Sequence, residues 1–499
     1  MFGAATHSTT IRVLDFNMVK KNRLLVSILL LVFVTGCTDP SAVDGDEKAG
    51  RPDVARNIVL FIGDGMGVST VTAARIFDGQ SLGLSGEEHS LAFESFPHLA
   101  LVKTYTTNQQ VAGSAGTATA IMTGQKTRAG LINVGPTAER RNCEAALAHP
   151  LEPLSVIAKK RGKAAGFVTT TRVTHATPAT VYAHSAERDW ESDEYLPESD
   201  KAMGCKDIAA QLVEFDAGGG LDIALGGGRE EFLGTGGNRT DPNDDLVSDW
   251  LNEAPNRRYV ETASALAEIQ PGEKVLGLFA GSHMTYIAER GEDSQEPTLV
   301  EMTTAAIRHL EAMDSGYFLM VEGGRIDHGH HDGKAGYAML EAQAFSHAVQ
   351  AALDIIDLDE TLVLVTADHS HVFTMGGYAT RGNPILGLVV ENDKTGRPNP
   401  EPALDANGVP YTTLGYANGP GAVDEVPRPE PEVGIDALSQ SLVKVVHVDI
   451  AGVTDHGETH GGEDVALYAT GVGADRVSRV IEQNRIFDIM MSAYGWSRD

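Results

Sequence analysis

Three apolar runs in the chain end at side chains that commonly bind metal ions. They are residues 57–63, followed by Asp64, residues 317–321, followed by Glu322, and residues 361–366, followed closely by Asp368 and His369. Runs rich in Val, Ile, Leu and Phe without polar alternation are typical of parallel strands that are buried on both faces. In open α/β sheets, a site forms beyond the carboxyl ends of the strands. The pattern therefore predicts that these side chains meet in one cluster that binds divalent metal ions.

Strand-like and helical segments alternate over most of the chain. Further strands are predicted at residues 99–104 and 165–170, and long helices at residues 297–313 and 335–353. Such alternation is typical of βαβ units. We therefore predict an α/β fold, with a central, mostly parallel sheet that is flanked by helices on both faces.

Two stretches interrupt this alternation. Residues 234–256 are rich in Gly, Asn and Asp and predict a surface excursion, whereas residues 381–434 are dense in Gly, Pro and Asn and predict an insertion outside the main sheet. Patterned structure resumes at residues 442–450. We expect one large domain, residues 57–490, that carries both additions.

The amino terminus has the features of an export signal. Basic residues precede an uncharged apolar run at residues 24–34. This run is too short to span a bilayer comfortably and has the flanks of a secretory signal peptide. Residues 1–36 are therefore predicted to be a signal peptide that starts at Met1 or at Met18. The mature protein is predicted to be exported, to the periplasm or the cell surface.

Residues 34–37 also resemble the cleavage box of bacterial lipoproteins, in which Cys37 becomes the lipidated first residue. The alternative is an ordinary signal peptide with an incidental cysteine. A lipid on Cys37 would anchor the protein to a membrane. The polar residues 37–56 are predicted to form a flexible tether between that anchor and the domain.

Composition narrows the possible partners. The 499 residues carry a net charge of -30, which argues against nucleic acid, because binding that polyanion requires basic surfaces. An anionic substrate must then be held by local cations, either metal ions or particular arginines. The remaining cysteines, Cys143 and Cys205, are an even pair in an exported chain. A disulfide is expected, with two buried thiols as the alternative.

Ser114 stands in a run of small residues, 113–120, where a helix is predicted to begin. A serine at such a position commonly caps the helix by satisfying free backbone amides. The alternative is a nucleophile, whose alkoxide would be favoured by the positive end of the helix and by an adjacent metal ion. This segment alone leaves both interpretations open.

Two other segments concentrate acids and imidazoles after predicted strands. Residues 322–331 and 366–371 contain Glu322, Asp327, His328, His330, His331, Asp368, His369 and His371. A structural histidine cluster is the alternative, but acids and imidazoles together at strand ends favour a metal site.

Through these segments, the chain resembles the alkaline phosphatase family, and most closely its animal type. The matching segments are residues 57–67, 114–120, 169–178, 321–331, 365–373 and 458–465, in that order. The resemblance extends over roughly residues 55–490, and the lipoprotein-type amino terminus suggests a bacterial member of the family.

The resemblance implies hydrolysis of phosphate monoesters through a phosphoserine on Ser114, with two zinc ions and one magnesium ion. Matching positions assign Asp327, His331 and His460 to the first zinc, Asp64, Asp368, His369 and the Ser114 oxygen to the second zinc, and Asp64, Thr177 and Glu322 to magnesium. The ligand types agree with this independently, because zinc binds imidazole and carboxylate, whereas an all-oxygen set suits magnesium.

Other matching positions concern the phosphate group. Arg188 matches the arginine that binds phosphate in the family, although alone it would be interpreted as a surface ion-pair residue. His175 and His328 match residues near magnesium and phosphate. His330 and His371 are predicted to be structural, because imidazoles that orient their neighbours are commoner than additional ligands.

The chain departs from the family at several positions. Gly113 stands where many members have an Asp that holds the arginine, so we expect weaker phosphate retention. Ala280 and Glu296 replace usual residues of a calcium site, which argues against calcium. By resemblance, Cys143 and Cys205 form a disulfide, and residues 381–434 correspond to the crown region at the dimer interface, which implies a homodimer.

Rival functions come from the same superfamily and from another class. A phosphodiesterase would have less use for Glu322 and Thr177, because a third metal ion suits a dianionic monoester. The sequence contains no Cys-x-Pro-x-Arg motif of a sulfatase nucleophile. The remaining alternative is a non-catalytic surface lipoprotein that binds metal or phosphate on the same scaffold.

Overall fold

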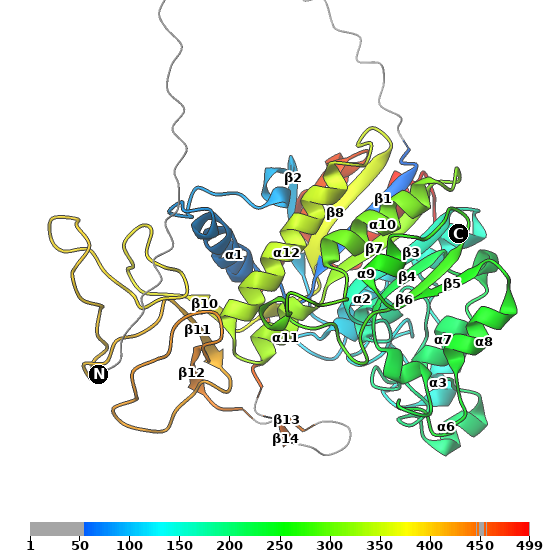
Figure 1. Ribbon diagram of the computed structural model, residues 1–499, viewed down its shortest axis with the longest axis horizontal. Helices are drawn as coiled ribbons and strands as arrows, with labels where there is room; N and C mark the ends of the chain where they lie inside the picture. Colours follow the sequence, from blue (N-terminus) through cyan, green and yellow to red (C-terminus); the bar gives the residue numbers. More distant parts are fainter. Residues whose placement is uncertain (1–53, 446, 449–453, 456, 499) are drawn as a thin grey trace, which may run out of the picture. The chain divides into compact units, whose positions relative to one another are not determined.

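The three apolar runs form the centre of a ten-stranded sheet (Figure 1). Strand β1, Asn57–Gly63, lies between β7, Tyr317–Gly323, and β8, Thr361–Ala367, and runs parallel to both. Every residue of these three strands is buried. Their lack of polar alternation is therefore explained, because both faces of the sheet are covered here.

The full strand order is β17-β2-β16-β8-β1-β7-β3-β4-β6-β5. The outer strands are β2 His98–Lys103, β3 Ala164–Arg172, β4 Ile223–Gly227, β5 Arg257–Val260, β6 Lys274–Leu278, β16 Val465–Gly471 and β17 Arg479–Glu482. Only β16 runs antiparallel to its neighbours, β2 and β8. The predicted mostly parallel sheet is confirmed.

Helices cover both faces of the sheet. Their bounds are α1 Val68–Ser81, α2 Ser114–Thr123, α3 Cys143–Ala148, α4 Leu154–Lys160, α5 Ala176–Ala179, α6 Glu198–Met203, α7 Ile208–Val213, α8 Leu246–Glu253, α9 Ala263–Leu266, α10 Leu299–Glu311, α11 Arg325–His331, α12 Ala335–Leu353 and α13 Arg485–Ala493. Figure 1 shows α1, α10 and α12 on one face, where α12 packs against the other two. The connection from β1 to β2, which contains α1, moves toward one edge of the sheet, and the connection from β2 to β3, which contains α4, moves toward the other edge. Because such crossovers are right-handed, α4 lies on the face opposite to α1.

The structure is a computed structural model that describes residues 54–445, 447–448, 454–455 and 457–498. The predicted signal peptide, Cys37 and nearly all of the predicted tether lie outside the described residues. Within the described ranges, no helix combines the length and the apolar character needed to cross a membrane.

The two predicted additions differ in structure. The first, residues 234–256, contains the helix α8, which the sequence did not predict. This helix buries Val247 and Trp250. The second, residues 381–434, contains β11, Leu414–Asn418, in a separate sheet with β10, Phe373–Met375, and β12, Gln440–Val443. Strand β11 of the second addition therefore does not belong to the ten-stranded sheet.

A disulfide joins Cys143 to Cys205, across 62 positions of the chain. The expected disulfide is confirmed, and the alternative of two buried thiols is wrong. Beside it lies a small apolar cluster that includes Trp190 and Leu196. The bridge closes a long loop, which restricts the unfolded chain, and the closed segment includes Arg188.

Candidate metal and phosphate site

Neighbouring strands bring the acids to one edge of the sheet. Ile62 pairs with Glu322 on one side and with Thr366 on the other. Ile62 and Thr366 each stand two positions before an acid, Asp64 and Asp368 respectively. Because the strands are parallel, their carboxyl ends meet at the same edge. Asp64, Glu322 and Asp368 have no exposed surface. Three carboxyl groups therefore lie buried together where the sequence predicted them.

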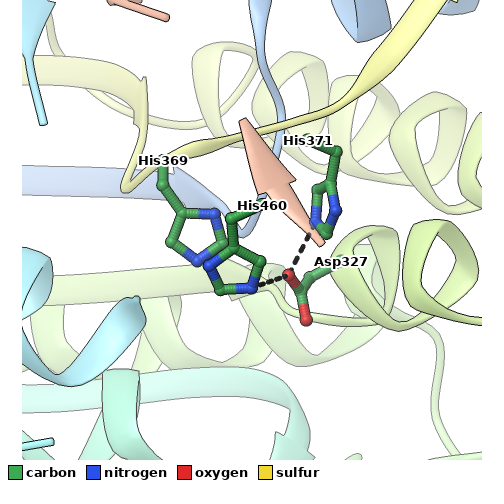
Figure 2. A group of neighbouring side chains, drawn as sticks. All are labelled: Asp327, His369, His371 and His460. Atoms are coloured by element: carbon green, nitrogen blue, oxygen red, sulfur yellow. Dashed lines mark hydrogen bonds and ion pairs between the residues drawn. The ribbon is translucent and has the colours of Figure 1, made fainter. Parts of the chain in front are cut away.

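Asp327, His331 and His460 form the first group, which we call half-site 1. Helix α11 places Asp327 and His331 one turn apart, and their Oδ2 and Nε2 atoms are 3.5 Å apart. His460, from the short strand β15, His460–Gly461, has its Nε2 atom 3.5 Å from Asp327 Oδ1 (Figure 2). Burial would raise the pKa of the Asp327 carboxyl, but His331 and His371 outweigh it and hold this pKa well below its usual value.

Half-site 1 has the geometry of a cation site. The Nε2 atoms of His331 and His460 are only 2.9 Å apart. The Nδ1 atom of His331 donates to the Glu458 carbonyl, and that of His460 donates to the Ala112 carbonyl, each at 2.7 Å. Burial, and next the charge of His369, lower the pKa of His460 well below its usual value, so this ring is neutral. Each ring thus turns its Nε2 atom toward the other, and a metal ion between them would bind both.

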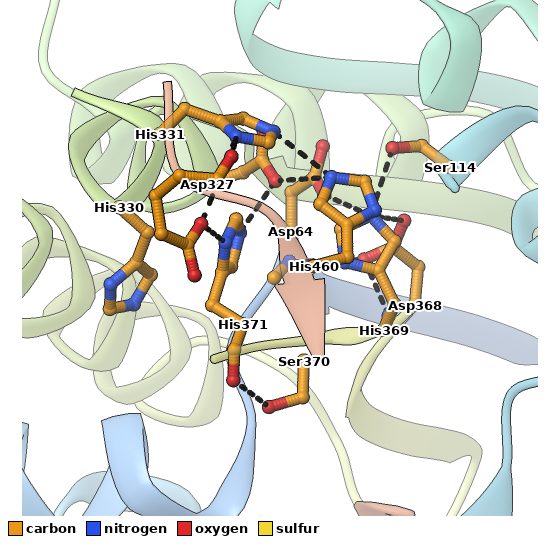
Figure 3. Close-up of polar contacts among 12 residues, drawn as sticks. Asp64, Ser114, Asp327, His330, His331, Asp368, His369, Ser370, His371 and His460 are labelled. Atoms are coloured by element: carbon orange, nitrogen blue, oxygen red, sulfur yellow. Dashed lines mark hydrogen bonds and ion pairs between the residues drawn. The ribbon is translucent and has the colours of Figure 1, made fainter. Parts of the chain in front are cut away.

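Asp64, Asp368, His369 and Ser114 form the second group, half-site 2 (Figure 3). The Nε2 atom of His369 is 3.2 Å from Ser114 Oγ, 3.3 Å from Asp368 Oδ2 and 3.5 Å from Asp64 Oδ1. The His369 and His460 rings stack with centroids 3.6 Å apart, so the two half-sites adjoin. Their arrangement suits two neighbouring metal ions.

Ser114 does not cap the helix it begins. It is the first residue of α2, and the capping position is occupied by Gly113, whose backbone is extended. The Ser114 hydroxyl instead faces His369 and is buried. The capping interpretation is therefore wrong. At this position the positive end of the helix favours a negative charge on the oxygen.

A third group is rich in oxygen atoms. Asp64, Glu322 and His175 place ligand atoms within 4.8 Å of one another. Both Asp64 Oδ atoms, Glu322 Oε1 and Thr177 Oγ1 are buried and have no hydrogen-bond partner among the described residues. Burial, and next the charge of Asp368, raise the pKa of Asp64 well above its usual value. Unpartnered buried acceptors are costly, and a hard cation such as magnesium would satisfy them.

Replacing Glu322 with Gln should reveal this cost in the metal-free protein. Burial raises the pKa of Glu322 from its usual 4.5 to about 7, so this carboxyl stabilises the fold at low pH, and its contribution is lost as pH rises through about 7. Gln does not titrate. The free energy of unfolding of Glu322→Gln, relative to the original protein, should therefore rise by up to about 3 kcal/mol from about pH 5 to about pH 8.

Urea unfolding in a chelator measures this difference. With magnesium bound, Glu322→Gln should instead be less stable than the original protein, because the variant lacks one charged ligand. A difference between the two proteins that does not change with pH in the chelator would contradict the expectation.

Arg188 lies beside the serine. An added Cβ atom on Gly113 would be 4.0 Å from Arg188 Nη1 and 3.7 Å from His460 Cε1. The Nη2 atom of Arg188 donates to His175 Nε2 at 2.8 Å. His175 thus restrains the guanidinium at Nη2, whereas an acid at position 113 would approach Nη1. His328 packs edge-on against His175, with ring centroids 5.6 Å apart.

Three further residues lie near the site. His371 was predicted to be structural, as an imidazole that orients a neighbour, and its Nε2 atom lies 2.7 Å from Asp327 Oδ1. Glu458 contacts His371 and His331. His283 packs against His328, with centroids 4.3 Å apart, and its Nε2 atom accepts from Arg172 at 2.6 Å. The sequence assigned no role to Glu458 or His283, because only the spatial pairing of distant segments brings these two residues to the site.

Glu296, at the position examined for calcium, is bonded within the protein. Its Oε2 atom accepts from the Thr285 amide at 2.9 Å, its Oε1 atom accepts from the Thr285 hydroxyl at 2.7 Å, and Arg290 lies 3.3 Å away. Both carboxylate oxygens therefore already have protein partners.

Comparisons with known proteins identify relatives over most of the chain. Residues 55–496 match the family model described as alkaline phosphatase. The tissue-nonspecific isozyme of alkaline phosphatase from Gallus gallus is 43% identical over 455 residues, which cover 87% of this chain and 83% of that protein. An alkaline phosphatase from Gadus morhua is 40% identical over 449 residues, which cover 87% of this chain and 90% of that protein.

Solved structures share the fold. The alkaline phosphatase of Thermus thermophilus has a TM-score of 0.63 at 24% identity, and covers 89% of this chain and 92% of its own. The alkaline phosphatase of the Antarctic bacterium TAB5 has a TM-score of 0.59 at 24% identity, and covers 89% of this chain and 99% of its own. At this identity the likeness concerns the fold alone.

Proposed function

Because this chain belongs to the alkaline phosphatase family and is therefore a phosphomonoesterase, we propose that it cleaves phosphate monoesters through a phosphoserine on Ser114, with two zinc ions and one magnesium ion. The observation that carries this proposal is the Ser114 hydroxyl, which lies at the start of α2 and 3.2 Å from His369 Nε2. The serine is thus next to the proposed second metal site.

The residues fit the proposed metal ions. Half-site 1 would hold one zinc ion through its carboxylate and two imidazoles. Half-site 2 would hold the other zinc ion, and the group of Asp64, Thr177 and Glu322 would hold magnesium. The unpartnered oxygen atoms of this third group and the facing Nε2 atoms of half-site 1 support the assignment. When bound, such ions supply positive charge that lowers the pKa of nearby hydroxyl groups and stabilises phosphoryl oxygens.

The protein's own groups then have distinct tasks. The Ser114 oxygen attacks phosphorus in line with the leaving group, the bond to the leaving oxygen breaks, and a phosphoserine forms. Water attacks the phosphoserine from the vacated side, which releases inorganic phosphate and restores the serine. Arg188 can donate two parallel hydrogen bonds to phosphoryl oxygens and so orient the group. Little of the leaving group need be held, so many monoesters should be accepted.

Substrate comparison tests this function directly. The protein should hydrolyse p-nitrophenyl phosphate, and a chelator should abolish the reaction, whereas bis(p-nitrophenyl) phosphate and p-nitrophenyl sulfate should be much poorer substrates. Faster hydrolysis of the bis-ester would support a phosphodiesterase, and faster hydrolysis of the sulfate would support a sulfatase. No turnover of any of the three would support a non-catalytic binding protein.

Gly113→Asp should tighten inhibition by phosphate. The extended backbone at Gly113, with φ of -124°, admits any residue, and an added side chain would approach Arg188. The new carboxylate should hold the guanidinium in place and lower the inhibition constant of phosphate by roughly two- to fivefold. Gly113→Asn is the matched control, because it has nearly the same shape without the charge. Equal inhibition constants in the glycine and aspartate proteins would count against this role.

We further propose that the protein is exported and forms a homodimer. One relative is named a membrane-bound alkaline phosphatase, from Bombyx mori. Near the second addition, Tyr378 and Leu442 are 87% and 81% exposed, so an interface there would bury apolar surface. Light scattering should give the mass of two chains, and mass spectrometry of the mature amino terminus should find a lipid on Cys37. A free, unmodified amino terminus would contradict the anchor.

A further inference from the structure

Glu458 is a fully buried acid that the proposed function does not use. Its side chain has no exposed surface, and it lies two residues before His460. The Oε2 atom accepts from His371 Nδ1 at 2.5 Å, and the Oε1 atom accepts from the Val372 amide at 2.8 Å. Both oxygens are therefore engaged, and one of them holds a histidine beside half-site 1.

His371 links Glu458 to Asp327, which is a proposed metal ligand. Its ring lies between two carboxyl groups, because Nδ1 contacts Glu458 and Nε2 lies 2.7 Å from Asp327 Oδ1. Figure 2 shows the second of these contacts. The ring is buried and packs against His330, with centroids 4.7 Å apart. Because the ring cannot turn without breaking both contacts, the position of Asp327 depends on that of Glu458.

The backbone of Glu458 holds a second proposed ligand. Its carbonyl accepts from His331 Nδ1 at 2.7 Å, and its amide donates to the His331 carbonyl at 3.0 Å. The first contact fixes which nitrogen of the ring faces half-site 1. Side chain and backbone of one residue thus act on Asp327 and His331, while His460 follows two positions later.

The segment that carries Glu458 is itself fixed. The Thr459 amide donates to Asn418 Oδ1 at 3.0 Å, and the Asn418 amide group donates to the Thr459 hydroxyl at 2.9 Å. His460 also pairs with His371 in a short antiparallel ladder. Glu458 is therefore held between β11 and the strand that carries His371, and its carboxyl group has a defined direction.

We propose that Glu458 is the positioning residue of half-site 1, which sets the orientation of Asp327 through His371 and that of His331 through its own carbonyl. This inference rests on the proposed function, because half-site 1 must hold a zinc ion for it to matter. Outer partners of this kind orient metal ligands, and their loss typically costs about 10- to 100-fold in metal affinity or activity.

Glu458→Gln tests the proposal, because it keeps the size of the side chain and its acceptor for Val372 but replaces the carboxylate that holds His371. Zinc release from the loaded protein is followed with a chromogenic chelator. One of the two zinc ions should leave about 10- to 100-fold faster, and the other at the original rate. Glu463→Gln is the matched control, because Glu463 lies on the same segment but bonds to the Ser370 hydroxyl, at 2.7 Å.

Three results would overturn the proposal. They are zinc release from Glu458→Gln at the original rate, equal acceleration for both zinc ions, and equal acceleration in Glu463→Gln. If Glu458→Gln does not fold, Glu458→Asp takes its place, because it keeps the charge but draws the carboxylate back from His371, and it should accelerate release of the same single ion. An original protein that fails to retain two zinc ions would instead contradict the proposed function.

Discussion

Ser114→Ala should lose turnover of p-nitrophenyl phosphate almost completely, with kcat lowered by at least about 10³-fold. The variant removes the oxygen atom that would attack phosphorus. Stability should change little, because Gly113 rather than Ser114 caps α2 and the serine makes no capping hydrogen bond. Steady-state kinetics measures the loss, and circular dichroism verifies the fold.

Unchanged turnover in Ser114→Ala would remove the serine from the mechanism. The zinc content of the variant makes the result specific. If the protein retains its metal ions and still fails to turn over, then the missing group is the nucleophile rather than the metal site.

Asp64→Asn should have the next largest effect. Asp64 belongs both to half-site 2 and to the oxygen-rich group, and within the described part of the chain neither of its carboxyl oxygens has a hydrogen-bond partner. One substitution therefore weakens two proposed metal sites at once. We expect kcat to fall by roughly 10³-fold, and metal analysis to find the second zinc and the magnesium depleted.

Stability distinguishes this outcome from simple misfolding. In the metal-free protein, Asp64→Asn should be at least as stable as the original, because it removes a buried acid that other acids surround. The matched control is Asp222→Asn, which breaks a buried ion pair of 2.6 Å with Lys159 and should lower stability without changing metal content. Full metal content in Asp64→Asn would contradict the proposal that Asp64 binds both the second zinc ion and the magnesium ion.

The sheet and its acidic edge could be predicted from the sequence because burial on both faces leaves a continuous apolar run. Strands β1, β7 and β8 show this signal, and each ends at or near an acid. The same reasoning fails for α8, whose eight residues bury only Val247 and Trp250 on one side. Two buried positions in a short segment do not establish a helical period.

The individual roles at the site required more than pattern. The assignment of Asp327 and His331 to one metal site came from resemblance, and a one-turn spacing on α11 is what allows it. The contact between Glu458 and His371 could not be predicted, because the ladder between β15 and β9, Ser370–His371, brings these residues together from distant parts of the chain. Likewise, Gly113 rather than Ser114 occupies the capping position because α2 begins at Ser114. The run of small residues does not mark where this helix begins.

The proposed phosphoserine is most directly tested by trapping it. The protein is mixed with excess monoester substrate and quenched in acid, and its peptides are analysed by mass spectrometry. The mechanism predicts phosphate on the peptide that contains Ser114, at the serine itself, and none on the same peptide of Ser114→Ala. Turnover of substrate with no phosphate on Ser114 at any quench time, or with phosphate on another residue, would contradict it.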